Sequence, residues 1–371
     1  MEQWKQDRLI DILDTLIDYR GKTPNKVECG IPLITAKIVK NGRIETPTEF
    51  LTVEDYKDWM VRGYPQMGDV VITTEAPLGE VAQLRDDKIA LAQRIVCLRG
   101  KEGVLDNTYL KYFLMSNIGQ YRLKARETGT TVTGIKQSEL KEVLIDYPNY
   151  ELQQKIASIL SSFDSKIELN RRINDNLEQQ AQALFKAWFV DNAVIGDASV
   201  SDYFIPLRGK NLLTSDAKGG EVPVVAGGLT PSAYHNVANT KAPVITISAS
   251  GANAGYVNLW GIPVWSADSS YIDSSITPHI YFWYNLLKFS QKNIFDSQTG
   301  SAQPHIYPKH IGDIRIPDLD LDKVADYNKI VTPIYEQITN TKKINAQLAE
   351  TRDTLLPKLM SGELKIGKVE M

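Results

Sequence analysis

Hydrophobic positions recur at helical spacing along one long stretch of the chain, residues 151–190. The stretch contains no glycine or proline, and its apolar residues follow one another at steps of three and four, which places them on one face of a helix. This seam consists of Ile156, Leu160, Phe163 and Ile167, followed by Leu177, Ala181, Leu184 and Trp188. At ~1.5 Å per residue the helix is roughly 50 Å long, so we expect a partner helix to cover its narrow apolar stripe.

The same pattern returns 171 positions further along the chain. The second seam consists of Val331, Ile334, Ile338, Leu348, Leu355 and Leu359. Polar residues interrupt both seams near the middle: Asn170 and Asn174 in the first, Thr341 and Asn345 in the second. Arg352, opposite Ala181 in the shift, has no polar match. Polar residues in an apolar seam cost stability and fix register, and these residues meet if the helices run antiparallel. We therefore predict an intramolecular antiparallel coiled coil; two unrelated amphipathic helices are the alternative.

The segments that precede the two helices also recur in one order. Each copy has an Arg-Gly-Lys turn, a buried strand that ends in a glycine turn, a strand, a helix, and a Thr-Gly-Thr or Thr-Gly-Ser loop. In the first copy we expect one strand over residues 89–100, with Arg94 inside it, and one helix over residues 106–126. A repeat of this length indicates two copies of one unit. The predicted fold class is α+β: two tandem mixed α/β domains (1–150 and 193–320), each followed by a long helix (151–192 and 321–371).

Composition limits the class of protein. The chain has 371 residues, 43% of them hydrophobic and 23% charged, so two domains with real cores are feasible. Its start is not typical of a signal peptide, no apolar run is long enough to cross a membrane, and two cysteines provide no disulfide framework. We expect a cytoplasmic protein. The net charge of −3 argues against a simple basic nucleic-acid binder, although Lys and Arg outnumber acids nine to four between Arg94 and Lys141.

Motifs of common catalytic sites are missing from the sequence. There is no P-loop, no GxGxxG after a strand, no [DN]PP[FYW] pattern and no HExxH. The four histidines lack a metal-ligand spacing, and Pro317-Asp318 with the distant Glu363 resembles a nuclease pattern only by chance. We therefore predict that the chain is not an enzyme and binds neither a cofactor nor a metal.

Loops rich in Arg, Lys, Thr, Ser, Asn and Gln remain, and these side chains suit contacts to phosphates and base edges. In the first copy the candidate DNA-binding residues are Arg20, Lys22, Thr23, Lys37, Thr74, Glu75, Arg94, Arg126, Thr128, Thr130, Thr131, Lys136 and Gln137. In the second copy they are Arg208, Lys210, Ser248, Ser250, Asn253, Thr299, Ser301, Gln303, His305 and Lys309. Residues 126–137 are the strongest candidate, because Gly129 and Gly134 allow the backbone to approach closely. The alternative for residues 20–23 is a solvated hairpin, and for residues 73–75 a satisfied turn.

The duplicated order resembles the specificity subunit of type I restriction–modification systems. The resemblance rests on the paired RGK turns, the strand-to-glycine turns at 69–81 and 242–257, TGTTVTGIKQSEL, and the helical tails IASILSSFDSKIELNRRINDNLEQQAQALF and ITNTKKINAQLAETRDTLLPKLMSGEL. It implies two target-recognition domains that each read one half of a bipartite site in double-stranded DNA. The helices would then set the spacer between the half-sites.

The resemblance also implies partner proteins. Two modification (methyltransferase) subunits would dock on the helices and restriction subunits would join through them. S-adenosylmethionine, ATP and Mg would be bound by those partners. Three alternatives stay open: a coiled-coil scaffold, a stand-alone DNA-binding protein, and a DNA methyltransferase or nuclease with degenerate motifs.

Overall fold

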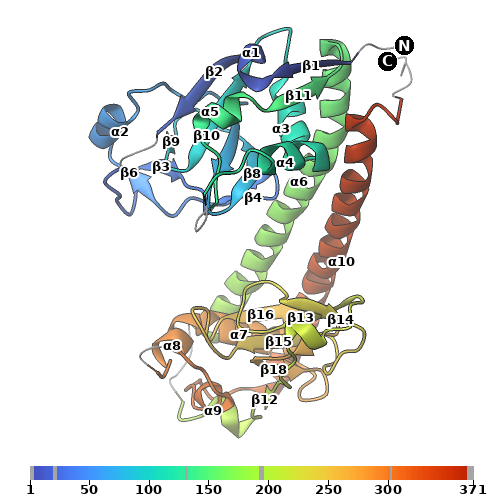
Figure 1. Ribbon diagram of the computed structural model, residues 1–371. Coiled ribbons are helices and arrows are strands. Elements are labelled where there is room, and N and C mark those ends of the chain that lie inside the picture. Colours follow the sequence, from blue (N-terminus) through green and yellow to red (C-terminus); the bar gives the residue numbers. More distant parts are fainter. Residues whose placement is uncertain (1–3, 20–22, 130–132, 192–195, 301–302, 366–371) are drawn as a thin grey trace. The chain divides into compact units, whose positions relative to one another are not determined.

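The computed structural model describes residues 4–19, 23–129, 133–191, 196–300 and 303–365 (Figure 1). The chain divides into two compact units. Unit 1 comprises Met1–Ile167 and Gln347–Met371, and unit 2 comprises Glu168–Ala346. Within the described residues no helix is long and apolar enough to cross a membrane. Arg20, Lys22, Thr130, Thr131 and Ser301, all predicted to bind DNA, lie outside the described residues.

Unit 1 is built on an antiparallel sheet of four strands in the order β2-β10-β7-β8. Smaller pairings are β1-β11, β6-β3-β9 and β4-β5. Its strands are β1 (Lys5–Arg8), β2 (Leu13–Asp18), β3 (Ile31–Ile34), β4 (Val39–Lys40), β5 (Arg43–Ile44), β6 (Phe50–Leu51), β7 (Val70–Thr74), β8 (Leu78–Gln83), β9 (Ala90–Leu91), β10 (Ile95–Gly100) and β11 (Leu144–Tyr147). Its shorter helices are α1 (Leu9–Ile12), α2 (Val53–Trp59), α3 (Asn107–Met115), α4 (Asn117–Lys124) and α5 (Gln137–Lys141).

The four-stranded sheet of unit 1 is buried on both faces, which explains why β7 reads as a continuous apolar run. Successive side chains of a strand point to opposite faces. Val70 and Ile72 pack with α3 and the long helices, whereas Val71 packs with the layer formed by β3, β6 and β9. The alternation makes this sheet the centre of the unit.

Unit 2 repeats the arrangement with a smaller outer layer. Its antiparallel sheet has the order β12-β18-β15-β16, and a second sheet has the order β14-β13-β17. The strands are β12 (Leu207–Arg208), β13 (Val222–Val225), β14 (Ala233–His235), β15 (Val244–Ser248), β16 (Val257–Trp260), β17 (Trp265–Ser266) and β18 (Ser269–Asp273). The shorter helices are α7 (Ile280–Phe289), α8 (Gln291–Asp296) and α9 (Pro308–Gly312), and 3-10 turns lie at Val200–Asp202 and Thr214–Asp216.

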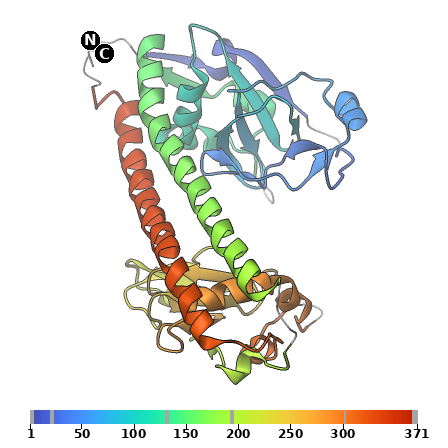
Figure 2. The ribbon, with the colours of Figure 1, turned by 180° about the vertical axis from the view of Figure 1, so that it is seen from behind.

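Two long helices, α6 (Tyr150–Phe189) and α10 (Leu321–Met360), each contain 40 residues. Their first and last residues differ by the 171 positions of the sequence repeat, and so do those of α5 and α9. They lie side by side in both views (Figures 1 and 2). In unit 2 the Asn170 side chain donates to that of Asn345 at 2.7 Å, and the Tyr327 hydroxyl donates to the Ala181 carbonyl.

Asn170 on α6 contacts Asn345 on α10, whereas Ala181, further along α6, contacts Tyr327, which comes earlier in α10. The helices therefore run in opposite directions, and the predicted antiparallel coiled coil is confirmed. The predicted polar layer is also confirmed at the Asn170–Asn345 pair.

Arg352, the seam position without a polar counterpart, has a different partner. In unit 1 its guanidinium lies 2.5 Å from the carboxylate of Asp164 on α6. The same carboxylate accepts hydrogen bonds from the Lys111 ammonium at 2.6 Å and the Tyr112 hydroxyl at 2.7 Å, both on α3. These four side chains, which we call the Asp164 cluster, tie both long helices to α3.

Two predicted elements are divided in the structure. The helix expected over residues 106–126 is α3 and α4, because Ser116 adopts an extended backbone and its hydroxyl accepts the N–H of Gly119 as an N-cap. The strand expected over residues 89–100 is β9 and β10, because Arg94 between them has a φ of 66°, outside the β region.

Candidate nucleic-acid interface

Three segments of unit 1 meet where β7 ends. The N–H of Thr74 donates to the carbonyl of Arg94 at 2.9 Å, and the N–H of Ile135 donates to the carbonyl of Thr74 at 2.9 Å. Thr128 and Gly134 exchange two backbone hydrogen bonds of 2.7 and 3.0 Å, which close the loop between them. We call this the unit 1 tip. Main-chain bonds therefore bring together residues 74, 75, 94, 128 and 134.

Gly134 is required by this arrangement. A Cβ added there would lie 2.7 Å from the Thr74 carbonyl oxygen and 2.8 Å from the Cβ of Glu75. The close approach expected of Gly134 is thus made to β7 of the same unit. Gly129, with a φ of 110°, occupies backbone space that favours glycine.

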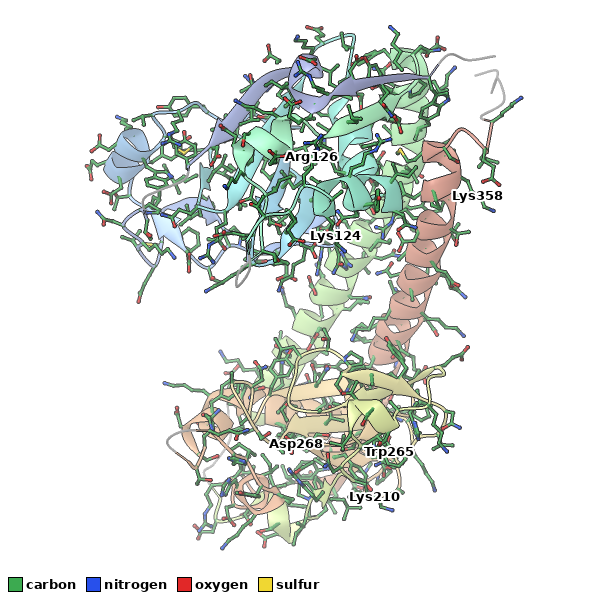
Figure 3. All side chains as sticks on the ribbon, in the orientation of Figure 1. Lys124, Arg126, Lys210, Trp265, Asp268 and Lys358 are labelled. Atoms are coloured by element: carbon green, nitrogen blue, oxygen red, sulfur yellow. The ribbon has the colours of Figure 1, made fainter. Side chains whose placement is uncertain are left out.

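The unit 1 tip presents charged side chains to solvent. The guanidinium of Arg94 lies 2.6 Å from the Glu75 carboxylate, and the two side chains are 53% and 38% exposed. Arg126 forms an ion pair with Glu139 of α5 at 3.0 Å. Lys124, the last residue of α4, is exposed two positions before Arg126, and both are labelled in Figure 3. The tip therefore carries both hydrogen-bond donors and acceptors.

The other predicted residues of unit 1 differ in exposure. Lys136 is exposed and precedes α5, and Gln137 is partly buried as its first residue. Thr23 and Lys37 are exposed before β3 and before β4. Within the described residues, no hydrogen bond or ion pair joins those two to the tip. Thr74 is only 2% exposed, so its predicted DNA contact does not fit this structure, because a buried side chain does not reach a ligand.

Unit 2 has the same main-chain bonds at the end of β15. The N–H of Ala249 donates to the Asp268 carbonyl at 3.1 Å, and the N–H of Ile306 donates to the Ala249 carbonyl at 2.9 Å. Thr299 and His305 exchange hydrogen bonds of 3.0 and 2.8 Å. We call this the unit 2 tip. Each bond corresponds to one in unit 1, so the two tips share one main-chain framework.

The side chains of the unit 2 tip surround a carboxylate. Asp268 accepts a hydrogen bond from the Arg208 guanidinium at 2.6 Å and another from the Ser250 hydroxyl. The turn that carries Arg208 is held in place, since the N–H of Lys210 donates to the Ser266 carbonyl and the Trp265 indole donates to the Lys210 carbonyl. Lys210, Trp265 and Asp268 all lie on this unit (Figure 3).

The remaining predicted residues of unit 2 are divided between surface and interior. Gln303 and Lys309 are exposed, and His305, which stacks on Tyr307 at an interplanar angle of 12°, is partly buried. Asn253 is partly buried. Ser248 is 4% exposed inside the sheet, so the DNA contact predicted for it does not fit this structure either.

Asp268 and Trp265 belong to the unit 2 tip but were not predicted. The missed signal was positional: Asp268 directly precedes β18, as Arg94 directly precedes β10. At the shift of 171 positions Arg94 falls on Trp265, whereas Asp268 lies 174 positions after Arg94, so the repeat does not pair these two residues. Among the residues that the structure describes, no three His, Cys, Asp or Glu side chains are placed to hold a metal ion.

Comparison with known proteins shows which proteins this chain is similar to. Residues 1–179 match the model of the type I restriction modification DNA specificity domain. The chain is 28% identical to the type I restriction enzyme MjaIX specificity subunit of Methanocaldococcus jannaschii, over 99% of this chain and 95% of that protein. It is also 28% identical to a putative type I specificity subunit of Mycoplasma genitalium, over 69% of this chain and 71% of that protein.

A solved structure has the same fold. The crystal structure of a type I restriction–modification S subunit from M. genitalium matches with a TM-score of 0.54 and 23% identity, covering 96% of both chains. Domain match, full-length relative and shared fold agree. This chain is therefore similar over nearly its whole length to specificity subunits of type I restriction–modification systems, and its residues 1–179 match the DNA specificity domain of that family.

Proposed function

We propose that this chain is the DNA-reading subunit of a type I restriction–modification complex and carries no catalysis itself. Each unit reads one half of a bipartite site through its tip. The helices α6 and α10 set the spacer between the half-sites and dock methyltransferase subunits, which restriction subunits join. S-adenosylmethionine, ATP and Mg are bound by those partners in the cytoplasm.

The observation that carries the proposal is the pair of tips with one framework and different side chains. Main-chain bonds fix where the side chains are presented, and the side chains decide what is recognised. A carboxylate, a guanidinium and hydroxyl groups are the groups that contact bases and phosphates. Two different readers on one chain suit an asymmetric bipartite site, and linked readers bind tightly only when the half-sites have the right separation.

Exposed apolar side chains on the long helices support the docking of partner subunits. Leu169 and Ile173 on α6 are 51% and 38% exposed, and Ile344 on α10 is 46% exposed. A coiled coil of two helices leaves such residues uncovered, and exposed apolar clusters are typical of protein interfaces. This observation favours a chain that works inside a complex over a stand-alone DNA-binding protein.

The experiment is to express the chain with its methyltransferase subunits and map the methylated sites in genomic DNA. We expect one bipartite sequence with a fixed spacer. Removing seven residues from each long helix preserves the seam and shortens the pair by ~10 Å, so the preferred spacer should contract by about 3 base pairs at 3.4 Å each. A spacer that stays unchanged would refute the role of the helices, and methylation by the chain alone would favour a degenerate methyltransferase.

A further inference from the structure

Arg94 and Asp268 occupy the same place in the two units but have opposite charges. Arg94 directly precedes β10, which pairs with β7, and Asp268 directly precedes β18, which pairs with β15. The Arg94 carbonyl accepts the N–H of Thr74, the last residue of β7, at 2.9 Å. The Asp268 carbonyl accepts the N–H of Ala249, directly after β15, at 3.1 Å. The same position of the main-chain framework therefore carries a guanidinium in unit 1 and a carboxylate in unit 2.

The partners of these residues differ in a matching way. In unit 1 the carboxylate comes from the residue directly after β7, as Glu75 pairs with Arg94 at 2.6 Å. In unit 2 the segment that follows β15 supplies the Ser250 hydroxyl, and the guanidinium comes from Arg208 at the end of β12. Both tips contain one guanidinium–carboxylate pair, but the order of the two groups is exchanged.

Stability does not explain these pairs. The side chains of Arg208 and Asp268 are 42% and 33% exposed, and exposed ion pairs contribute little to folding because solvent screens them. Arg94 has the further cost of a left-handed backbone, with a φ of 66°, which is unfavourable for residues other than glycine. An unfavourable backbone that presents an exposed guanidinium is typical of a functional site.

Nucleic-acid chemistry distinguishes the two groups. A guanidinium donates two hydrogen bonds to O6 and N7 of guanine, and a carboxylate accepts from the N4 amino group of cytosine. Resting on the proposed function, we propose that Arg94 reads a guanine in the half-site of unit 1. At the corresponding place Asp268 reads a cytosine in the half-site of unit 2. Glu75 and Arg208 orient these two side chains through the ion pairs.

The test is selection of randomised bipartite DNA by the complex of this chain with its methyltransferase subunits. Arg94→Gly removes the side chain and suits the left-handed backbone, so folding should be retained. We expect the preference for guanine at one position of one half-site to fall about tenfold or more. The other half-site and the spacer should stay unchanged. Arg94→Lys, which keeps the charge without the two-pronged donor, should also relax that position.

Asp268→Ala should relax one cytosine position in the other half-site and leave the first half-site intact. Arg8→Ala is the matched control, because Arg8 forms an exposed ion pair with Asp11 at the end of β1 and should leave both half-sites unchanged. Equal loss of affinity for all sequences in Arg94→Gly would make Arg94 a phosphate contact and overturn the inference. An unchanged consensus in both variants would also overturn it, whereas a wild-type complex that selects no bipartite site would overturn the proposed function.

Discussion

Replacement of Asp164 alone should destabilise unit 1 strongly. Its carboxylate faces the Lys111 ammonium and the Arg352 guanidinium, and the side chains are 19%, 7% and 12% exposed. Asp164→Asn keeps the volume and removes the charge. The Lys111 ammonium would then remain buried without a counter-ion, and Arg352 would keep only its ion pair with the exposed Asp353 at 2.8 Å. Leaving a buried charge unpaired costs much more than the pair itself contributes.

The magnitude follows from this burial. Removing one partner from a buried ion pair costs about 3–5 kcal/mol. For a unit of this size each kcal/mol lowers Tm by ~2–4 °C, so a loss of about 3 kcal/mol should lower the Tm of unit 1 by roughly 6–12 °C. Replacing Lys111, Asp164 and Arg352 together by Met, Leu and Met should restore much of the stability, because apolar side chains of similar volume replace buried ions at little cost.

The pH dependence has a definite sign. Burial alone would raise the pKa of Asp164. The nearby Lys111 ammonium and the hydrogen bonds that the Asp164 carboxylate accepts lower its pKa below the ordinary value of 3.8. The unfolded chain therefore binds the proton more readily than the folded chain. The contribution of Asp164 is present above pH 3.8 and is lost as the pH falls through its lowered folded pKa. In Asp164→Asn this part of the acid dependence should disappear.

The assay is urea unfolding, in which the denaturant does not screen charges, with hydrogen exchange to assign the loss to unit 1. Glu151→Gln on the same helix is the control, because the Glu151–Lys155 pair is exposed at 78% and 49%. Its cost should stay below about 0.5 kcal/mol. If Asp164→Asn costs no more than this control, the cluster is solvated and the reasoning fails.

Three further variants test other parts of the structure. Replacing both Asn170 and Asn345 by Leu should raise the urea midpoint of unit 2, because an apolar layer replaces a polar one; a lower midpoint would contradict the seam. Gly134→Ala should destabilise unit 1 by about 1–3 kcal/mol through the clash with β7, and site selection should weaken in one half-site only; equal weakening in both would contradict separate readers. Tyr327→Phe should cost unit 2 about 1 kcal/mol of unfolding free energy, measured in urea, through the lost hydrogen bond to Ala181; no change would show that the bond is immaterial.

The periodic elements were predictable because their information is local. The seam of α6 and α10 depends on residues three and four positions apart, and their bounds follow the repeat of 171. The division at Ser116 was missed because the same serine is acceptable inside a helix, and only the extended backbone makes it a cap. The break at Arg94 was missed because a β-rich sequence does not reveal a φ of 66° set by contact with β7.

The Asp164 cluster was not predictable for a different reason. Asp164 follows the seam residue Phe163, where a charged side chain is ordinarily solvated. Its cations come from positions 53 residues earlier and 188 residues later in the chain. Only the packing of α3 against both long helices brings them together, and no periodicity in the sequence records that packing.

The repeated sequence pattern predicted where the two tips lie, but only some of the side chains they carry. Their framework consists of main-chain hydrogen bonds, which do not depend on side-chain identity, so the repeated loops indicated where side chains are presented. The presented residues differ between the two tips, and Asp268 lies outside the 171-residue register that relates the repeats, so the repeat does not pair it with Arg94. The residues of the two tips should therefore be compared by their position on the main-chain framework rather than by residue type.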